Sequence, residues 1–304
     1  MEIEVTREHS NKPVLYILTQ VLGLSRGMIK HLKFLDDGIM LNGNKVTVRA
    51  VVNEGDRLYL NTDCEPESKI EPVDLDIGIA YEDEDIVVPD KPPFMPTHPS
   101  HDHYDDTVAN ALAYRYRDST ESFVFRPVNR LDRNTSGLLI IARSRIAAAK
   151  LYRDMQKKEI RKKYIAILEG VPKERRGTIE TYIKRTEESI IVREVCGEGE
   201  GGDLAITEYK VLLDNGKYSV VLAEPITGRT HQLRVHFKSI GCPIVGDDIY
   251  GNESELIDRH ALHSAMLSFG HPSDGRSIVL KAPLHDDMRL LFEKLFGNEV
   301  LDYE

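Results

Sequence analysis

The chain of 304 residues contains no tryptophan and only three cysteines, Cys64, Cys196 and Cys242. Three widely spaced cysteines fit neither a disulfide framework nor a zinc site, so we expect a reducing, cytoplasmic setting. No apolar run is long enough to cross a membrane, and residues 1–5 lack the basic and apolar regions of a secretory signal. We therefore expect neither a membrane partner nor a leader peptide.

The 40 lysines and arginines are outnumbered by 50 aspartates and glutamates, so the formal net charge is −10. That balance alone argues against a nucleic-acid partner, but the charges are unevenly distributed. Residues 61–125 contain 16 acidic and four basic side chains, whereas residues 143–176 contain 12 basic and four acidic ones. Because phosphate contacts depend on the local surface, the basic segment keeps RNA open as a partner. The acidic stretch is most simply a solvated surface.

The most informative segment is 126–142, in which Asp132 stands between Arg130 and Arg133. The apolar run 138–142 that follows is short and begins after a glycine, which predicts a buried strand. A carboxylate between two cations, in a loop fixed by a core strand, stays ionised and held in place. Such a group can act as a nucleophile or a base, although a structural ion pair has the same local pattern.

Arg130-Leu131-Asp132 followed by Thr135-Ser136-Gly137 resembles the signature of the RluA-type RNA pseudouridine synthases. Three further regions resemble motifs of that family in the same order, namely 161–166, 225–236, and 242–247 together with 262–264. The resemblance covers about residues 75–285. Several long motifs in a fixed order are far more specific than any one of them.

The resemblance implies an isomerisation of uridine to pseudouridine that needs neither a metal nor a cofactor. It implies that Asp132 is the catalytic carboxylate and that Arg130 holds the target nucleotide in a flipped-out state. By the same resemblance, Tyr164 packs against the uracil and Arg234 forms an ion pair with Asp132. Arg229 and His231 then bind RNA phosphate or orient the loop. Without the motif, Tyr164 would be read as a core tyrosine.

Residues 12–60 form a separate pattern. The apolar spacing of residues 14–22 predicts a helix, and Ser25 is a suitable N-cap for a second helix that Gly38 would end. Asn42-Gly43 between the short strand segments 39–41 and 44–46 predicts a β-hairpin, and residues 56–60 predict a further strand. This order resembles the S4 RNA-binding domain.

Three cations on the second predicted helix follow the spacing i, i+4 and i+7, namely Arg26, Lys30 and Lys33. Side chains at this spacing share one helix face. Such a face is either simply solvated or suited to a phosphate backbone, and the S4 resemblance favours phosphate.

We predict an S4-like domain at residues 1–65, a linker at 66–76 and a pseudouridine synthase catalytic domain at 77–304. The irregular order of elements predicts an α+β fold with a mainly antiparallel, mixed sheet, preceded by the small α/β S4-like domain. The predicted helices are 107–116, one that begins after Ser144, and 230–240; the later strands are 163–169, 178–184, 189–195, 204–213 and 218–224.

Two segments imitate other kinds of site. His98, His101 and His103 lie near three aspartates, which would suit a metal-dependent hydrolase, but the segment is a proline-broken loop without a rigid scaffold for ligands. Residues 196–202 imitate a phosphate-binding glycine loop, yet Glu198 and Glu200 would repel phosphate. We expect that segment to be a hairpin loop.

The sequence therefore predicts a monomeric RNA pseudouridine synthase acting on structured RNA. Ribosomal RNA of the large subunit is the first expectation and transfer RNA the second. A catalytically silent S4-type RNA-binding protein is the alternative from another class, and the intact Asp132, Tyr164 and Arg234 argue against it.

Overall fold

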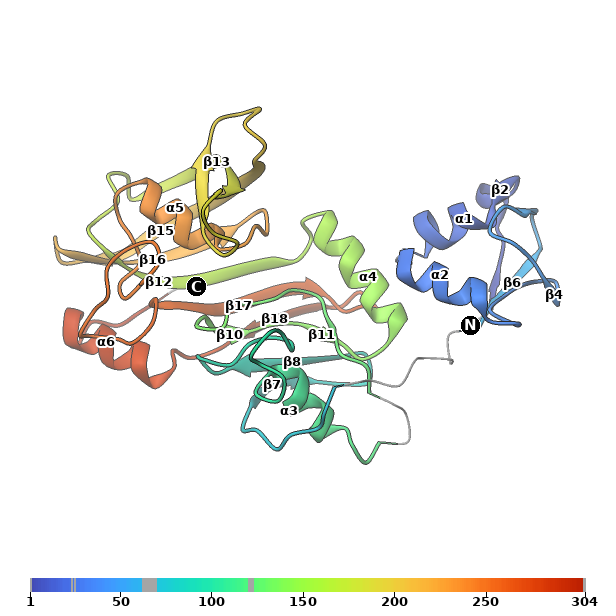
Figure 1. Cartoon of the computed structure of the whole chain (residues 1–304), viewed down its shortest axis with the longest axis horizontal. Helices are drawn as coiled ribbons and strands as arrows, with labels where there is room; N and C mark the ends of the chain where they lie inside the picture. Colours follow the sequence, from blue (N-terminus) through green and yellow to red (C-terminus); the bar gives the residue numbers. More distant parts are fainter. Residues whose placement is uncertain (1, 23, 25, 62–69, 120–122, 303–304) are drawn as a thin grey trace.

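The computed structural model describes residues 2–22, 24, 26–61, 70–119 and 123–302, with only the backbone of Arg26 and Gly27. These residues form an N-terminal unit (residues 2–61) and a larger unit (residues 70–302), which are distinct bodies in Figure 1. None of the described helices is both long enough and apolar enough to span a membrane.

The N-terminal unit has an apolar core of its own. Val14, Leu18, Val52, Leu58 and Leu60 are all fully buried in it. Four strands pair in the order β1-β6-β3-β4, and β2 pairs with β5. Its elements are β1 (Glu2–Glu4), η1 (Arg7–His9), β2 (Lys12–Pro13), α1 (Val14–Tyr16), η2 (Ile17–Val21), α2 (Arg26–Phe34), β3 (Ile39–Leu41), β4 (Asn44–Lys45), β5 (Val51–Val52) and β6 (Arg57–Leu60).

The predicted hairpin is confirmed, because β3 and β4 pair across Asn42 and Gly43. Both turn residues have a positive φ, 50° and 79°, as a two-residue hairpin turn requires. The first predicted helix is also present, as α1 continued by the π-helical η2. The second helix ends at Phe34 rather than next to Gly38, because residues 35–38 form a turn and bend.

The cationic face of α2 is described only in part. Ile29 and Leu32 point into the core, whereas Lys30 and Lys33 are exposed on the solvent side. The predicted N-cap, Ser25, and the side chain of Arg26 lie outside the described residues. Two of the three predicted cations are thus available to a partner.

The larger unit is built on one sheet of twelve strands in the described residues. Ten follow the order β14-β13-β15-β16-β12-β17-β10-β8-β11-β9, while β18 pairs with β17 and β7 pairs with β8. The strands are β7 (Gly78–Glu82), β8 (Ile86–Lys91), β9 (Arg126–Pro127), β10 (Ser136–Leu138), β11 (Ile141–Ala142), β12 (Arg161–Glu169), β13 (Arg176–Arg185), β14 (Arg193–Cys196), β15 (Asp203–Asp214), β16 (Tyr218–Pro225), β17 (Leu262–Gly270) and β18 (Ser277–Lys281).

Within the described residues every strand pair is antiparallel except β10 with β17, so the predicted α+β fold with a mainly antiparallel, mixed sheet is confirmed. Successive residues of β8 alternate between two apolar clusters, as a strand requires. Val87 belongs to the cluster that packs with α3, α5 and α6, whereas Ile86 and Val88 belong to the cluster that packs with α4. The helices are α3 (Val108–Arg115), α4 (Arg145–Gln156), α5 (Gln232–Ser239) and α6 (Asp286–Phe296).

Two predicted helices begin close to the expected residues, α3 one residue after Thr107 and α4 directly after Ser144. The Thr107 side chain accepts a hydrogen bond from the Asn110 amide at the start of α3, and Ser144 accepts one from the Ala147 amide at the start of α4. The helix predicted at 230–240 begins later, at Gln232, because Thr230 and His231 belong to the preceding turn.

The strand predicted at 138–142 is fully buried but is divided into β10 and β11. Its pairing with β8 keeps one register on both sides of the gap. Leu139 lies opposite Pro89 and donates its amide N–H to the Pro89 carbonyl at 3.3 Å. Pro89 has no N–H to donate in return, so the regular ladder is interrupted there.

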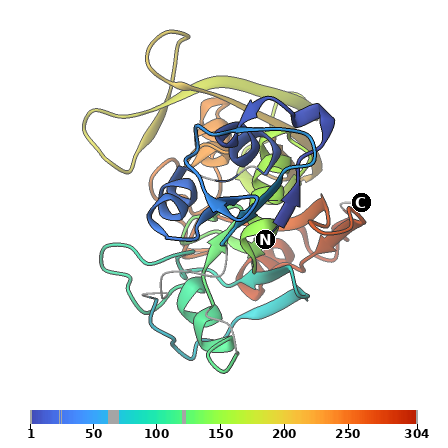
Figure 2. The ribbon, with the colours of Figure 1, turned by 90° about the vertical axis from the view of Figure 1, so that its right-hand side faces the viewer.

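The glycine-rich segment is not the predicted hairpin loop. It joins β14 to β15, and these strands lie on opposite sides of β13, so the segment is a crossover. β14 also begins at Arg193, later than the predicted strand at 189–195, because the preceding residues form a turn in which Ser189 accepts two amide N–H groups. Figure 2 shows the loops of this region reaching away from the body of the sheet.

Candidate active site

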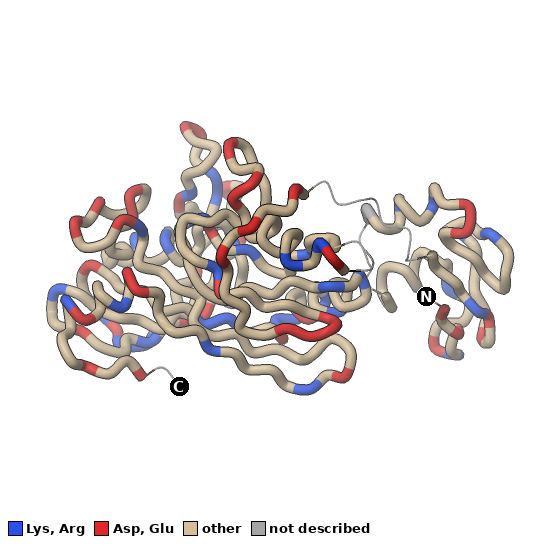
Figure 3. The backbone as a smooth tube through the Cα atoms, turned by 90° about the horizontal axis from the view of Figure 1, so that it is seen from below, with Lys and Arg blue, Asp and Glu red and all other residues tan. Residues whose placement is uncertain are grey.

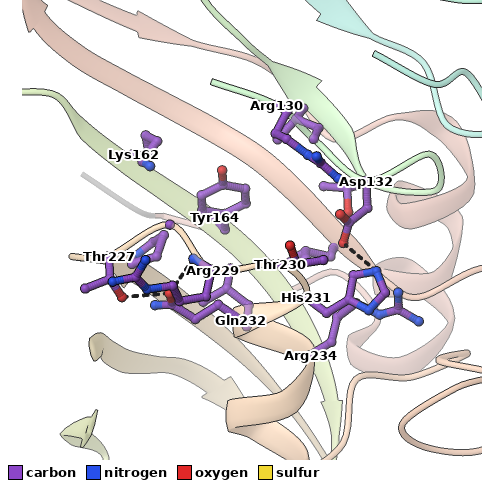
Figure 4. A pocket seen from close by; sticks show the side chains of 16 residues that line it. Arg130, Asp132, Lys162, Tyr164, Thr227, Arg229, Thr230, His231, Gln232 and Arg234 are labelled. Atoms are coloured by element: carbon purple, nitrogen blue, oxygen red, sulfur yellow. Dashed lines mark hydrogen bonds and ion pairs between the residues drawn. The ribbon is translucent and has the colours of Figure 1, made fainter. Parts of the chain in front are cut away.

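One pocket of about 120 Å³ gathers side chains from four segments that are far apart in the sequence. It is lined by the Asp132 loop between β9 and β10, by β12, by residues 225–234 at the end of β16 and the start of α5, and by Leu262 on β17. Figure 4 shows these side chains converging. All six site residues predicted in the catalytic domain line this pocket: Arg130, Asp132, Tyr164, Arg229, His231 and Arg234.

Two buried basic side chains, Lys91 and Arg259, donate hydrogen bonds to the backbone of the Asp132 loop. The Lys91 ammonium donates to the carbonyl oxygens of Pro92, Met95 and Arg133 at 2.8, 2.8 and 2.9 Å, and its side chain is fully buried. Burial and, to a smaller extent, the charge of Arg259 lower the pKa of Lys91 to about 7, although the charge of Asp132 acts in the opposite direction. The loop backbone is therefore anchored at several points.

Arg259 is the second of these cations, and its side chain is fully buried. It donates to the Asn134 carbonyl at 2.9 Å and forms two hydrogen bonds, at 2.6 and 2.9 Å, with Asp287 at the start of α6. A bidentate arginine–carboxylate pair fixes both groups in one plane. The loop is thereby tied to a helix more than 150 residues further along the chain.

Gly137 decides how closely β10 can approach β17. Its φ is 104°, and a Cβ atom there would lie 2.3 Å from the Ser264 carbonyl oxygen. Only glycine combines that conformation with that approach. The glycine of the motif therefore allows the single parallel strand pair of the described sheet, directly behind the Asp132 loop.

Tyr164 lies in the pocket wall on β12, with 7% of its surface exposed. The pairing of β12 with β17 shifts register between Lys163 and Tyr164, which is a β-bulge. Bulges redirect side chains and are common beside active sites. Burial raises the pKa of Tyr164, the hydrogen bond with Ser264 lowers it and the nearby Asp132 raises it further, so the side chain is a neutral phenol at physiological pH.

Arg234 lines the pocket, but the predicted ion pair with Asp132 is wrong for this structure. Its guanidinium forms a bidentate pair with Asp247, with Nε–Oδ2 at 2.7 Å and Nη2–Oδ1 at 2.6 Å. Burial lowers the pKa of Arg234, but its hydrogen bond and charge interaction with Asp247 outweigh that effect and raise it. Asp247 takes the guanidinium because it is fully buried beside it, whereas the Asp132 side chain is 23% exposed.

Among the predicted site residues, His231 has a ring nitrogen that faces the Asp132 carboxylate. Its Nε2 lies 4.0 Å from Asp132 Oδ2, and its Nδ1 lies 2.8 Å from the Tyr250 hydroxyl. Burial lowers the pKa of His231, the negative charge of Asp132 raises it, and Arg234 lowers it again, with a net decrease. The imidazole is therefore neutral near pH 7.

Arg130 and Arg229 are exposed at the rim of the pocket. Arg229 donates through Nε to the Leu204 carbonyl at 3.0 Å, and its Nη1 lies 3.7 Å from Asp203. Arg130 also lines a second pocket of about 240 Å³ beside Asp132 and His231. Figure 3 shows that residues of both signs are interspersed along the chain.

Sequence reasoning missed two functional candidates in this pocket. Lys162 is 9% exposed, its side chain has no hydrogen bond or ion pair with any described residue, and burial lowers its pKa. Gln232 holds the turn before α5, because its Oε1 accepts from the Thr227 hydroxyl and the Arg229 amide. Both lie inside quoted motifs, and period-two alternation from Tyr164 places Lys162 on the pocket side.

The histidines of the segment 98–103 do not converge on one set of ligands. In the described residues, no group of three or more His, Cys, Asp or Glu side chains is arranged to hold a metal ion. His101 is exposed beside Asp102, while His103 forms a separate pair with Asp106. The metal-dependent hydrolase alternative therefore has no geometric support.

Comparison with known proteins agrees with this site. A model of the RNA pseudouridylate synthase family matches residues 85–239. The chain is 34% identical over 299 residues to the uncharacterized RNA pseudouridine synthase YhcT of Bacillus subtilis, and this match covers 98% of each chain. It is 34% identical over 276 residues to the ribosomal large subunit pseudouridine synthase D of Vibrio parahaemolyticus, covering 86% of this chain and 84% of that one.

A solved structure of human RNA pseudouridylate synthase domain containing 1 superimposes with a TM-score of 0.57 at 32% identity, covering 72% of this chain and 86% of the human one. The sheet, the pocket and these similarities agree with one another. The chain belongs to the RNA pseudouridine synthase family, whose members are isomerases.

Proposed function

We propose that the protein converts uridine to pseudouridine in large-subunit ribosomal RNA, with Asp132 as the catalytic carboxylate. The observation that carries the proposal is the convergence of Asp132, Tyr164 and Arg234 on one pocket. The choice of RNA is supported by relatives named ribosomal large subunit pseudouridine synthase D. Asp132 is partly exposed to the pocket and firmly held through its loop, as a reacting group must be.

The reaction breaks the bond between N1 of uracil and C1′ of ribose, turns the uracil, and joins its C5 to C1′. The hydrogen on C5 leaves as a proton and the freed N1 takes up a proton, so the product is an isomer of the substrate and no oxidant is needed. A carboxylate beside the sugar can act as nucleophile or base in this sequence. The Tyr164 ring offers a flat apolar wall to the detached base.

A uridine stacked in RNA cannot reach Asp132, so the nucleotide flips out at a cost of a few kcal/mol. Arg130 and Arg229 at the rim are placed to bind phosphates on either side of the flipped nucleotide, and Arg130 would stabilise the flipped state.

The N-terminal unit is proposed to be an S4-like RNA-binding domain within residues 1–65. The exposed Lys30 and Lys33 on α2 would bind the phosphate backbone away from the active site. Residues 66–76 would be the linker, and residues 77–304 the catalytic domain.

The test is tritium release from RNA labelled at C5 of uridine, with ribosomal and transfer RNA supplied in separate reactions. Forming the C5–C1′ bond expels the C5 hydrogen, so wild-type protein is expected to release tritium from ribosomal RNA. Asp132→Asn keeps the size of the side chain and is expected to abolish release while RNA binding, followed by filter retention, persists.

Wild-type turnover by Asp132→Asn would refute the catalytic assignment. Release from transfer RNA alone would replace the proposed substrate. If wild-type protein binds RNA yet releases no tritium from either pool, the alternative of a silent RNA-binding protein is favoured.

A further inference from the structure

His231 bridges the proposed catalytic carboxylate and a buried tyrosine. Its Nε2 faces Asp132 Oδ2 at 4.0 Å, and its Nδ1 is hydrogen-bonded to the Tyr250 hydroxyl at 2.8 Å. The His231 side chain is 11% exposed and Tyr250 is 3% exposed, so little water competes for these groups. Figure 4 shows the imidazole lying directly under the Asp132 carboxylate.

The hydrogen bonds of Tyr250 favour one tautomer of His231. The Tyr250 oxygen already accepts the backbone N–H of Arg193 at 2.8 Å. Its own hydroxyl hydrogen then needs an acceptor, and the Nδ1 atom of His231 provides one. A neutral imidazole that accepts at Nδ1 carries its proton on Nε2, and that N–H faces Asp132.

The backbone at His231 supports this orientation. Its φ is 57° and its ψ 18°, a left-handed conformation that is uncommon for residues other than glycine. Strained backbone of this kind persists where surrounding contacts enforce it and is frequent at active sites. Here Gln232 supplies such contacts, since it binds the Thr227 hydroxyl and the Arg229 amide on the preceding turn.

We propose that His231 and Tyr250 are positioning residues for Asp132, an inference that rests on the proposed catalytic role of Asp132. The Nε2–H of His231 donates to Oδ2 of Asp132 in the substrate complex and leaves Oδ1 free to react with the nucleotide. A separation of 4.0 Å is too long for a hydrogen bond, but such contacts often tighten only when substrate is bound.

Tyr250→Phe is a clean probe of this chain of hydrogen bonds. The Tyr250 ring packs over Arg234, with the guanidinium carbon 4.9 Å from the ring centre, and phenylalanine retains that ring. The substitution removes only the hydroxyl, which leaves Nδ1 of His231 without its donor and the Arg193 backbone N–H without that acceptor. Tyr209→Phe, on β15, is the matched control because its hydroxyl has no hydrogen bond with any described residue.

The first measurement is the ¹⁵N spectrum of histidine-labelled protein, in which the ring nitrogen shifts distinguish the two neutral tautomers. Wild-type His231 is expected to carry its proton on Nε2, and Tyr250→Phe is expected to give a mixture of tautomers. Tyr209→Phe is expected to leave the signal unchanged. A wild-type proton on Nδ1 would overturn the proposal, whatever the activity.

The second measurement is single-turnover tritium release as a function of RNA concentration. Tyr250→Phe and His231→Asn are each expected to lower the maximal rate roughly 10- to 100-fold, a range typical of residues that orient a reacting group, with little change in half-saturating RNA. Asparagine tolerates the left-handed backbone but is too short to place a donor at Nε2. His231→Gln reaches that position and is expected to recover part of the rate.

Because Tyr250 is proposed to act through His231, adding Tyr250→Phe to a protein that already carries His231→Asn is expected to cause no further loss of the maximal rate. Independent, multiplicative losses, or losses confined to RNA affinity, would overturn the proposal. Asp132→Asn in the same assay separates the two hypotheses. Normal turnover by Asp132→Asn defeats the proposed function, whereas normal turnover by His231→Asn beside an inactive Asp132→Asn defeats only the positioning role.

Discussion

At the scale of residues, two carboxylates act on the Arg234 guanidinium, and Asp247 rather than Asp132 binds it directly. Asp132, Tyr164 and Arg234 all line one pocket. The partner of Arg234 was not predictable, because Asp132 and Asp247 are both carboxylates within the matched motifs. Only their burial in the folded chain, with the Asp247 side chain 0% exposed and that of Asp132 23% exposed, shows which one holds the guanidinium.

At the residue scale, we predict that the Lys162 side chain contributes to the affinity for RNA. A buried cation without a counter-charge is unfavourable, so in a pocket proposed to receive RNA we expect the missing partner to be a phosphate. Lys162→Met is expected to weaken RNA binding roughly 10- to 100-fold, since a hydrogen bond to a charged group contributes about 1.5–3 kcal/mol. Half-saturating RNA concentration in the tritium assay measures the effect.

Lys163→Met is the matched control, because Lys163 is the next residue on β12 and points to the other face of the strand. The control is expected to bind RNA within twofold of wild type, and Lys162→Arg is expected to restore most of the affinity. Equal losses for both methionine variants would show that only general charge matters.

At the scale of elements, the active site depends on one loop packed against the sheet. The sequence predicts the buried run at 138–142, and the parallel approach of β10 to β17 explains why Gly137 precedes it. The clamps on the loop come from Lys91 and Arg259, which are distant in sequence. Their roles are visible only when the acceptor carbonyls are located.

Lys91→Met tests the clamp. It removes three hydrogen bonds and leaves the carbonyls of Pro92, Met95 and Arg133 without that donor. The free energy of unfolding is expected to fall by on the order of 3 kcal/mol, and turnover is expected to fall with it. Urea unfolding measures the change, with the exposed Lys173→Met as control. A variant as stable as wild type would contradict the clamp.

The stability difference between wild type and Lys91→Met is expected to depend on pH. The pKa of Lys91 is about 7 in the folded chain against an ordinary value of 10.5, so between these values the unfolded chain binds more protons. Wild-type stability is therefore expected to rise relative to Lys91→Met as pH increases from about 7 toward about 10. Urea midpoints of both proteins across that range provide the comparison.

At the scale of the whole molecule, two units with separate cores share one chain. The N-terminal unit buries its own apolar cluster, and no residue of it lines the described catalytic pocket. Its expected contribution is affinity for RNA rather than chemistry. A net charge of −10 does not oppose this, because the exposed Lys30 and Lys33 act locally.

Removal of residues 1–65 is expected to weaken RNA binding and to flatten its dependence on salt. The slope of log affinity against log salt becomes shallower by about 0.7–0.9 for every phosphate that the protein no longer neutralises. Lys30→Ala with Lys33→Ala, a milder change, is expected to make the slope shallower by about 1.5. Filter binding at several salt concentrations measures both, and an unchanged slope would remove RNA binding from this unit.

The sequence by itself determined the class of fold, the hairpin at Asn42-Gly43, the helices that begin near Thr107 and after Ser144, and six of the residues that meet in the pocket. These follow from local conformational preference and from motifs that each lie within a few residues. Tertiary structure alone decided that Arg234 holds Asp247, that His231 faces Asp132, and that residues 196–202 cross over β13. Such pairings depend on which surfaces are buried together, a long-range property that no short stretch of sequence contains.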